Sequence, residues 1–212
     1  MYIYTILIMN NINKLAKKSS SASEFAQRYF DYLHKVLNTI NPKSIELLVK
    51  EFEDSAKKGS TIFVAGNGGS SATSSTLAND LGFDILKKTR TKNPFRIFSL
   101  NDNAPVMTAI SNDVGYENLF INQLKIHYRK GDKVIFISVS GNSKNLINAA
   151  KWVKLKKGKI ISFLGFDGGQ LRSLSDIVIL SSTQKGEYGP AEDSHLIINH
   201  ILAHWFQNFP IK

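Results

Sequence analysis

Apolar residues follow two different patterns along this chain. Between residues 21 and 59 they recur every three or four positions, which predicts two leading amphipathic helices. Ser21 to Glu24 has the form of a capping box at the start of the first helix. Pro42 suits the start of the second helix, and Gly59 is a stop signal after it.

Five short apolar runs follow, each of the length expected for a strand buried on both faces. Helical spacing returns between these runs, and alternation of strand and helix is typical of a parallel sheet. We therefore predict an α/β fold, a three-layer α/β/α sandwich around a five-stranded parallel sheet, preceded by N-terminal helices. The predicted strands are 61–65, 95–100, 133–138, 159–164 and 177–180, and the predicted helices lie near 71–81, 104–111, 116–128, 143–157 and 190–207.

An apolar segment, Tyr2 to Met9, precedes the first pattern. It is far too short to span a bilayer, and it has neither the basic region nor the small-residue cleavage site of a signal peptide. Two interpretations stay open: Met9 is the true start of the protein, or the segment is an apolar arm that packs on a partner subunit. We predict an N-terminal arm over residues 1–20, ordered or disordered, and a single domain over residues 21–212.

The composition fits one globular domain, with 212 residues, 42% of them hydrophobic and 21% charged. The chain has no cysteine, which excludes disulfides, thiolate zinc sites and a cysteine nucleophile, and fits a cytoplasmic protein. A net charge of +10 favours anionic partners: nucleic acid, membrane surfaces or phosphorylated small molecules. The lysine-rich run at 154–159 is more typical of a solvated helix end than of a nucleic-acid site.

Two loops rich in glycine and serine follow the first and third predicted strands, and the carboxyl ends of such strands are where ligands bind. Glycine allows tight turns, helix N-termini offer free N–H groups, and hydroxyls can donate to phosphate oxygens. Taken alone, each loop is better interpreted as a serine-rich helix cap. Two of them at comparable strand ends favour an oxyanion site, although neither matches a Walker A or a dinucleotide-binding motif. The loops are Gly66-Asn67-Gly68-Gly69-Ser70 and Ser138-Val139-Ser140-Gly141-Asn142-Ser143.

The order of these motifs resembles the sugar isomerase (SIS) domain, and more closely the bacterial phosphoheptose isomerases. The motifs are AGNGGS, then SNDVGYENLF, then SVSGNSKN, and then a late helix with a histidine. The resemblance implies the isomerisation of sedoheptulose 7-phosphate for surface polysaccharides, by a homotetramer with shared active sites. It also implies that Ser138, Ser140 and Ser143 bind the phosphate group of the sugar. The other substrate contacts that we expect are Asn67, Gly68, Ser70, Asn79 and Asp102.

The chain departs from this family at positions that matter for metal binding. The family carries a His and a Glu after GNGGS and a Gln-Glu-x-His pattern on the late helix. Thr76 and Asn79 stand in the first two places, Glu192 replaces the Gln, and His195 is kept. In the family the His, Glu, Gln and last His can bind zinc. Zinc usually takes several His or carboxylate ligands, so we expect no metal and no other cofactor here.

Aldose–ketose isomerisation needs a base for the carbon-bound proton and an acid for the oxygens. Asn79 cannot be the base, and Asp80, turned by about 100° on a regular helix, should face elsewhere. In the family the Glu and the last His serve as acid and base, so the resemblance implies this role for His195. With Asn79 in the place of the Glu, we predict that Glu192 and His195 are the catalytic pair. The alternative is that Glu192 is a solvated carboxylate favoured by the helix dipole. His200, four residues before His204, is open to interpretation as a metal ligand or, better, as an interface or core residue.

Two functions compete on this evidence. The first is a cytoplasmic phosphosugar isomerase with altered acid–base residues, free of membrane and nucleic acid. The alternative is a non-catalytic SIS-domain protein that senses a sugar phosphate or binds the replication initiator, which the loss of the family Glu favours. The chain has no room for a helix-turn-helix domain beside the SIS domain, which disfavours a transcriptional regulator.

Overall fold

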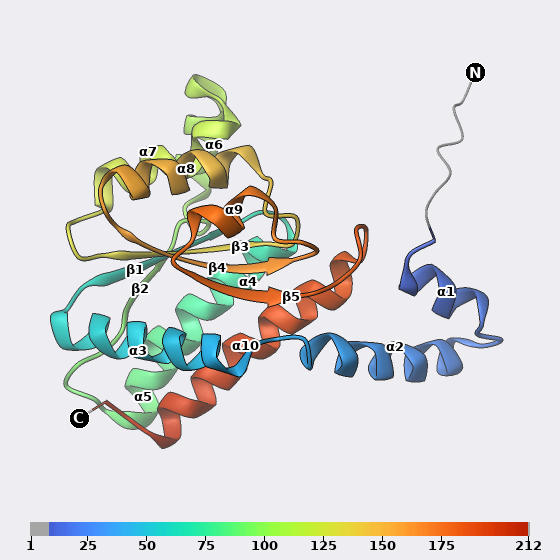
Figure 1. Cartoon of the computed structure of the whole chain (residues 1–212). Coiled ribbons are helices and arrows are strands. Elements are labelled where there is room, and N and C mark those ends of the chain that lie inside the picture. The colour runs from blue at the N-terminus through green and yellow to red at the C-terminus, as the bar shows by residue number, and fades with distance from the viewer. Residues whose placement is uncertain (1–8, 212) are drawn as a thin grey trace.

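A computed structural model describes residues 9–211 of the chain (Figure 1). The apolar segment Tyr2 to Met9 lies outside these residues except for its last position, so both interpretations of it stay open. Within the predicted arm, residues Asn11–Lys17 form helix α1, whose first turn is capped by the side chain of Asn10. The domain proper starts at α2, where Ser21 caps the helix as the capping box predicts.

The sheet is five-stranded and wholly parallel, which confirms the predicted fold class. Its strand order is β2-β1-β3-β4-β5, so β1 and β3 are neighbours in the middle of the sheet although β2 separates them in sequence. Gly66 at the end of β1 pairs with Ile137 near the end of β3, which brings the two predicted loops side by side. The strands are β1 (Thr61–Gly66), β2 (Arg96–Ser99), β3 (Lys133–Ser138), β4 (Lys159–Gly165) and β5 (Ile177–Ser181).

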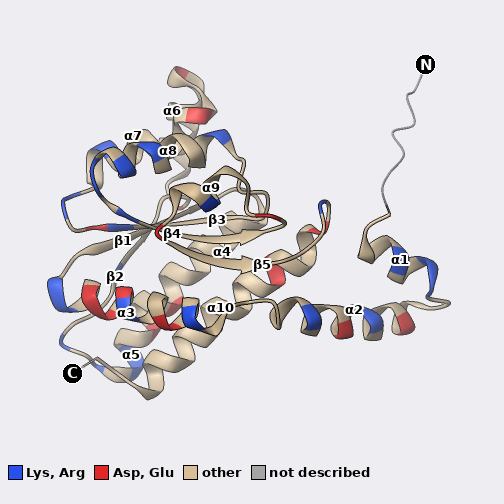
Figure 2. Cartoon of the chain, viewed as in Figure 1, with Lys and Arg blue, Asp and Glu red and all other residues tan. Residues whose placement is uncertain are grey.

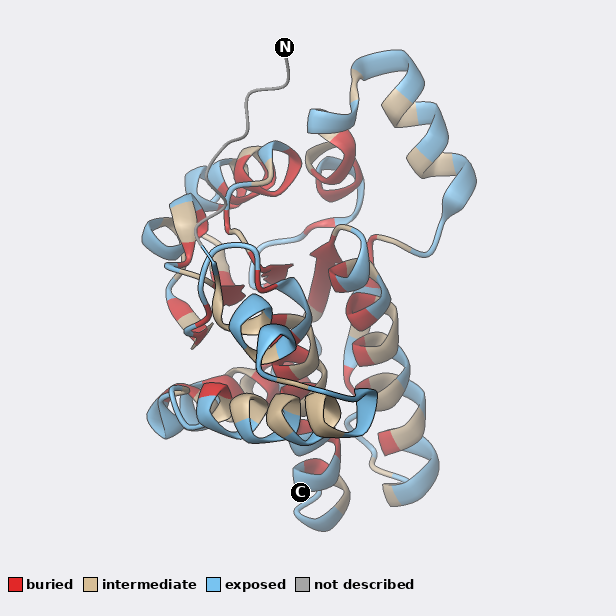
Figure 3. Cartoon of the chain, turned by 90° about the vertical axis from the view of Figure 1, so that its right-hand side faces the viewer, coloured by how far each residue is buried: buried red, intermediate tan, exposed pale blue. Residues whose placement is uncertain are grey.

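Helices cover both faces of the sheet, and the strands alternate their side chains between two cores. Ile62 and Val64 of β1 belong to the core shared with α3 and α10, whereas Phe63 and Ala65 belong to the core shared with α7 and α8. The buried surfaces of the helices accordingly face the sheet (Figure 3). The helices are α2 (Ala22–Leu37), α3 (Pro42–Lys58), α4 (Gly69–Ala78), α5 (Ile85–Thr89), α6 (Ala104–Val114), α7 (Leu119–His127), α8 (Lys144–Leu155), α9 (Gly169–Leu174) and α10 (Tyr188–Asn208).

Two short irregular helices interrupt this pattern. The helix predicted over 71–81 is regular only as far as Ala78, where α4 gives way to a π-helix, η1 (Asn79–Asp84). A 3₁₀ turn, η2 (Tyr116–Asn118), precedes α7. π-Helical turns change the angle between successive side chains and are frequent at functional sites. The segment after the first glycine loop therefore presents its residues in a different direction from the one that a regular helix predicts.

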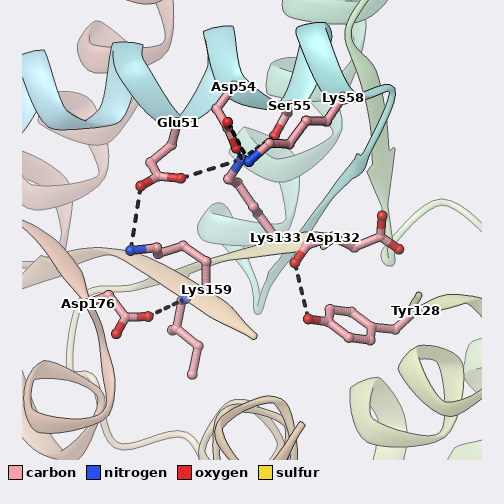
Figure 4. A network of polar contacts seen from close by, with 10 residues as sticks. Glu51, Asp54, Ser55, Lys58, Tyr128, Asp132, Lys133, Lys159 and Asp176 are labelled. Carbon is pink, nitrogen blue, oxygen red and sulfur yellow. Dashed lines mark hydrogen bonds and ion pairs between the residues drawn. The ribbon is translucent and has the colours of Figure 1, made fainter. Parts of the chain in front are cut away.

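A buried lysine ties the start of β3 to α3 (Figure 4). The Lys133 ammonium donates to Asp54 at 2.7 Å and to the Ser55 hydroxyl at 2.9 Å, and lies 3.4 Å from Glu51. Glu51 also lies 3.5 Å from the ammonium of Lys159 on β4. The Lys133 side chain is only 4% exposed, so it depends on these partners, since an unpaired buried charge is very costly. This network fixes α3 at the amino ends of the strands.

The positive charge is not gathered into one patch. Lys and Arg are spread over the helices of both layers and over α1 and α2 (Figure 2). None of the helices within residues 9–211 combines the length and apolar character that a membrane span requires.

Candidate functional site

A pocket of about 210 Å³ lies where the chain leaves β1 and β3 in opposite directions. From β1 the chain enters α4 beneath the sheet, and from β3 it enters α8 above it. Crevices at such switch points are the usual ligand sites of parallel sheets. The lining residues are Asn67, Ser70, Ile137, Ser138, Val139, Ser140, Ser143, Tyr188 and Glu192. The sequence predicted six of these nine residues: Asn67, Ser70, Ser138, Ser140, Ser143 and Glu192.

The glycine loop after β1 brings the first turn of α4 close to α10. Gly68 has a φ of 56°, a left-handed angle that glycine adopts without strain. A β-carbon on Gly69 would lie 2.5 Å from the carboxylate of Glu192. The carboxylate therefore rests directly against the main chain of residue 69. Gly68 is itself exposed and contributes the turn, whereas Asn67 and Ser70 on either side of it line the pocket.

Both the nitrogen and the oxygen of the Asn67 side-chain amide are hydrogen-bonded. It exchanges two hydrogen bonds of 3.0 Å with the amide of Asn145 on α8, and its oxygen accepts a further bond of 2.8 Å from the Tyr116 hydroxyl. Tyr116 and Asn145 were assigned no role from the sequence, although they lie inside the motifs SNDVGYENLF and SVSGNSKN. Their role is to join the two loops.

The serine loop after β3 offers hydroxyls without adding charge. Ser138 accepts a hydrogen bond from the N–H of Gly141 at 3.1 Å, and Ser140 accepts one from the N–H of Asn142 at 3.3 Å. Because each hydroxyl is used as an acceptor, its proton stays available for a donor bond to an anion. Ser143 occupies the N-cap position of α8 without a side-chain capping bond. The nine lining residues include no Lys or Arg, so this pocket suits phosphate through hydroxyls and a helix N-terminus.

The start of α9 fixes the shape of the serine loop. The N–H of Leu171 donates to the Gly141 carbonyl at 3.0 Å, and the N–H of Gln170 donates to the Asn142 side chain at 3.1 Å. Gly141 has a φ of 62°, and a β-carbon there would overlap the Gly168 carbonyl oxygen. Glycine is therefore required at position 141 both for its backbone angle and for its lack of a side chain.

Glu192 and Tyr188, both on the first turns of α10, close the pocket opposite the serines. Burial raises the pKa of the Glu192 carboxyl, and the nearby Asp193 carboxylate raises it further. A carboxyl with a raised pKa is suited to proton transfer near neutral pH. Tyr188, which the sequence analysis did not single out, packs edge-on against Phe166 with 5.2 Å between ring centroids. Glu192 is therefore a pocket residue rather than a carboxylate directed at bulk solvent.

The structure does not bring His195 to the pocket, which corrects the predicted pairing with Glu192. His195 is 0% exposed and packs against Phe163 of β4, and neither ring nitrogen has a hydrogen-bond partner among the described residues. The reason is the path of α10, which passes from the pocket to the underside of the sheet within one turn. Burial lowers the pKa of His195 to about 4.

Asn79 and Asp102 also lie outside the pocket lining. Asn79 is exposed, and its amide donates to the neighbouring Asp80 at 3.1 Å. Asp102 is exposed on the loop after β2 and accepts a hydrogen bond from Ser75 on α4. Both were predicted to contact substrate, and within one chain neither faces the serine loop.

A second polar cluster forms where η1 meets α10. Asp80 accepts a hydrogen bond from the Asn199 amide at 2.7 Å, and the same carboxylate oxygen lies 3.8 Å from Nε2 of His200. The His200 side chain is 52% exposed, so its ring is accessible, whereas Asp80 is largely covered at 17%. Asp80 was expected to face away from the Glu192 pocket, and it lies outside the lining of that pocket, beside Asn199 and His200 of α10. A carboxylate beside an accessible imidazole is a common arrangement for general acid–base chemistry.

Comparison with known proteins agrees with this architecture. The family model for the SIS domain matches residues 24–165. The chain belongs to the SIS domain family. This chain is 31% identical over 195 residues to the phosphoheptose isomerase of Helicobacter pylori. The match covers 91% of this chain and 94% of that protein. The chain is 36% identical over 161 residues to the phosphoheptose isomerase of Leptospira biflexa, covering 76% and 80%. A solved phosphoheptose isomerase from Neisseria gonorrhoeae superimposes with a TM-score of 0.77 at 22% identity, covering 89% of this chain and all of that one.

The residues of one SIS chain do not fit the zinc set that the family resemblance implies. Thr76 donates its hydroxyl to the Ala72 carbonyl at 3.0 Å, and Asn79 is engaged with Asp80. Within residues 9–211, no three His, Asp or Glu side chains come together as a metal site. Asp80 and His200 are only two such groups, and catalytic zinc sites generally use three protein ligands.

The buried His195 makes the stability of this SIS chain depend on pH. Below its ordinary pKa of 6.5 the unfolded chain binds a proton at this residue, whereas the folded chain does so only near pH 4. Stability should therefore fall as the pH drops below 6.5, by about 2 kcal/mol between pH 7.5 and pH 5. Denaturant unfolding of the wild type and of His195→Leu at both pH values measures this effect. The variant should lose that part of the pH dependence, and the exposed His127→Leu control should keep it. An equal pH response in all three proteins would contradict the assignment.

Proposed function

We propose that this chain is a cytoplasmic phosphosugar isomerase that interconverts an aldose and a ketose, with sedoheptulose 7-phosphate or a related sugar phosphate as substrate. The observation that carries the proposal is the meeting of two hydroxyl-rich loops with Glu192 in one pocket. The family assignment supports the same chemistry and implies a role in precursors of surface polysaccharide, including lipopolysaccharide.

In the proposed reaction, Ser138, Ser140 and Ser143 hold the phosphate at the N-terminus of α8, and the open-chain sugar extends toward α10. Glu192 removes the proton from the carbon beside the carbonyl and returns it to the adjacent carbon. Burial and the neighbouring Asp193 raise the pKa of this carboxyl, which makes it a stronger base than an exposed carboxylate. The absence of Lys and Arg from the pocket lining favours this role for Glu192, since a lysine beside it would lower the pKa of the carboxyl.

The proton on the sugar oxygens needs a second group, and we propose His200 with Asp80 for this role. His200 lies eight residues beyond Glu192, about 12 Å along the helix, which is too far for one chain to place both on neighbouring atoms. We therefore propose a homotetramer with shared active sites, in which His200 and Asp80 of one chain face the Glu192 pocket of another. The exposure of the His200 ring supports this assignment.

The non-catalytic alternative predicts a phosphate site without proton-transfer groups. It was motivated by the loss of the family Glu after GNGGS. Glu192 in the pocket and Asp80 beside His200 supply carboxylates, so the loss of the family Glu no longer argues against catalysis. An isomerase is therefore the better supported function.

Substitution of Glu192 and of Ser140 should separate catalysis from phosphate binding. Glu192→Gln keeps the shape but removes the base, so kcat should fall by about two to four powers of ten. Ser140→Ala removes a phosphate contact that is equal in ground and transition states, so KM should rise with little change in kcat. Steady-state kinetics with sedoheptulose 7-phosphate and related ketose phosphates measures both. Full activity in Glu192→Gln would exclude this residue as the base.

Chelation tests the proposal that no metal takes part. Activity should survive dialysis against EDTA, and added zinc should not increase it, because no three His, Asp or Glu side chains come together as a metal site within residues 9–211 of one chain. The readout is kcat together with metal content by elemental analysis. Loss of activity with EDTA and recovery with zinc would contradict the proposal and would point to a metal held between chains.

A further inference from the structure

The residues at the start of α10 contact two different sets of neighbours. Tyr188 and Glu192 line the pocket. Glu187 and Asp193, immediately before and after them, are bonded instead to the N-terminal helices α1 and α2. These helices lie beside the loop that joins β5 to α10 (Figure 1). The same short segment therefore carries pocket residues and the attachment points of the N-terminal helices.

Glu187 is a buried carboxylate held by three separate segments. It is 1% exposed and accepts hydrogen bonds from the Asn11 N–H of α1 at 2.5 Å, from the Tyr32 hydroxyl of α2, and from the Gln184 N–H of its own loop at 2.8 Å. Asn11 also donates its amide to Tyr32 at 3.0 Å, which closes the cluster. A buried carboxylate without such donors is strongly unfavourable, so these contacts hold α1 and α2 against the loop.

A second attachment lies one turn further along α10. The Tyr29 hydroxyl of α2 donates to Asp193 at 2.5 Å. A β-carbon on Gly189 would lie 3.1 Å from the same hydroxyl, so α2 approaches the main chain of α10 closely at this point. Burial, together with the neighbouring carboxylate, raises the pKa of both tyrosines, to about 12 for Tyr32. Both hydroxyls therefore stay protonated and remain donors at any physiological pH.

We propose that Glu187 is a positioning residue for the pocket. Through it and Asp193, helices α1 and α2 set the angle at which α10 presents Tyr188 and Glu192 to the serine loop. This inference rests on the proposed isomerase function, and it gives the N-terminal helices a role in catalysis although they line no part of the pocket.

Two conservative variants of the full-length enzyme test the proposal. Glu187→Gln replaces one carboxylate oxygen by an amide nitrogen, which cannot accept the hydrogen bonds that Asn11, Tyr32 and Gln184 donate. Tyr32→Phe removes one of these donors. Each should lower kcat about tenfold to a hundredfold, because small displacements of a reacting group are that costly. KM for the sugar phosphate should stay within about twofold, because the serine loop is untouched. Glu46→Gln on the exposed side of α3 and Tyr128→Phe at the opposite end of the sheet are matched controls and should leave kcat unchanged.

Hydrogen–deuterium exchange gives a readout that does not need turnover. In Glu187→Gln, amides in residues 187–193 should exchange at least several times faster, whereas residues 138–145 should keep the wild-type rate. Faster exchange throughout the domain, or faster exchange at 187–193 with unchanged kcat, would overturn the positioning role. If the wild type itself shows no isomerase activity but exchange rises only at 187–193, the proposed function fails and the attachment through Glu187 stands.

Discussion

The Glu192 carboxylate lies directly against the main chain of residue 69, at the first turn of α4. A β-carbon at that position would lie 2.5 Å from the carboxylate, so this close approach of the carboxylate requires a glycine. The same approach partly buries the carboxyl and raises its pKa. The position of the carboxyl and the upward shift of its pKa are thus both linked to this contact with the main chain of a glycine. Neighbouring elements fix the rest of the pocket. The start of α9 is hydrogen-bonded to the serine loop, and Asn145 and Tyr116 are hydrogen-bonded to Asn67.

The pocket uses neutral groups where many phosphate sites use lysine or arginine. Its hydroxyls accept backbone N–H bonds within the loop and keep their protons for an anion. This choice has a chemical consequence. A cation at the phosphate would also stabilise the charged form of the adjacent Glu192, whereas hydroxyls and a helix N-terminus bind phosphate with less effect on its pKa. The positive charge of the chain is instead spread over the helices of both layers.

Much of this architecture could be predicted from the sequence, because buried parallel strands and glycine loops have strong local patterns. The five strands and the two loops with their serines were located in this way, whereas Glu192 was singled out through the family resemblance. Asp80 was assigned no role, since its contacts with Asn199 and His200 depend on how α10 packs against η1, which hydrophobic spacing does not reveal. His195 was misplaced because its environment depends on the path of α10 beneath the sheet, and not on its distance from Glu192 in sequence. Tyr188 gave no signal, since an exposed tyrosine at the start of a helix is chemically unremarkable until the fold brings the serine loop opposite to it.

The most direct test of the central claim is solvent exchange into the substrate. The wild-type protein is incubated with sedoheptulose 7-phosphate in deuterium oxide, and the first and second carbons of the sugar are followed by proton NMR. Proton transfer by Glu192 within the serine pocket predicts deuterium at the second carbon of the aldose product and at the first carbon of the recovered ketose. Binding of the sugar phosphate, seen as a rise in melting temperature, with neither aldose formation nor deuterium uptake would contradict the account and identify a binding protein.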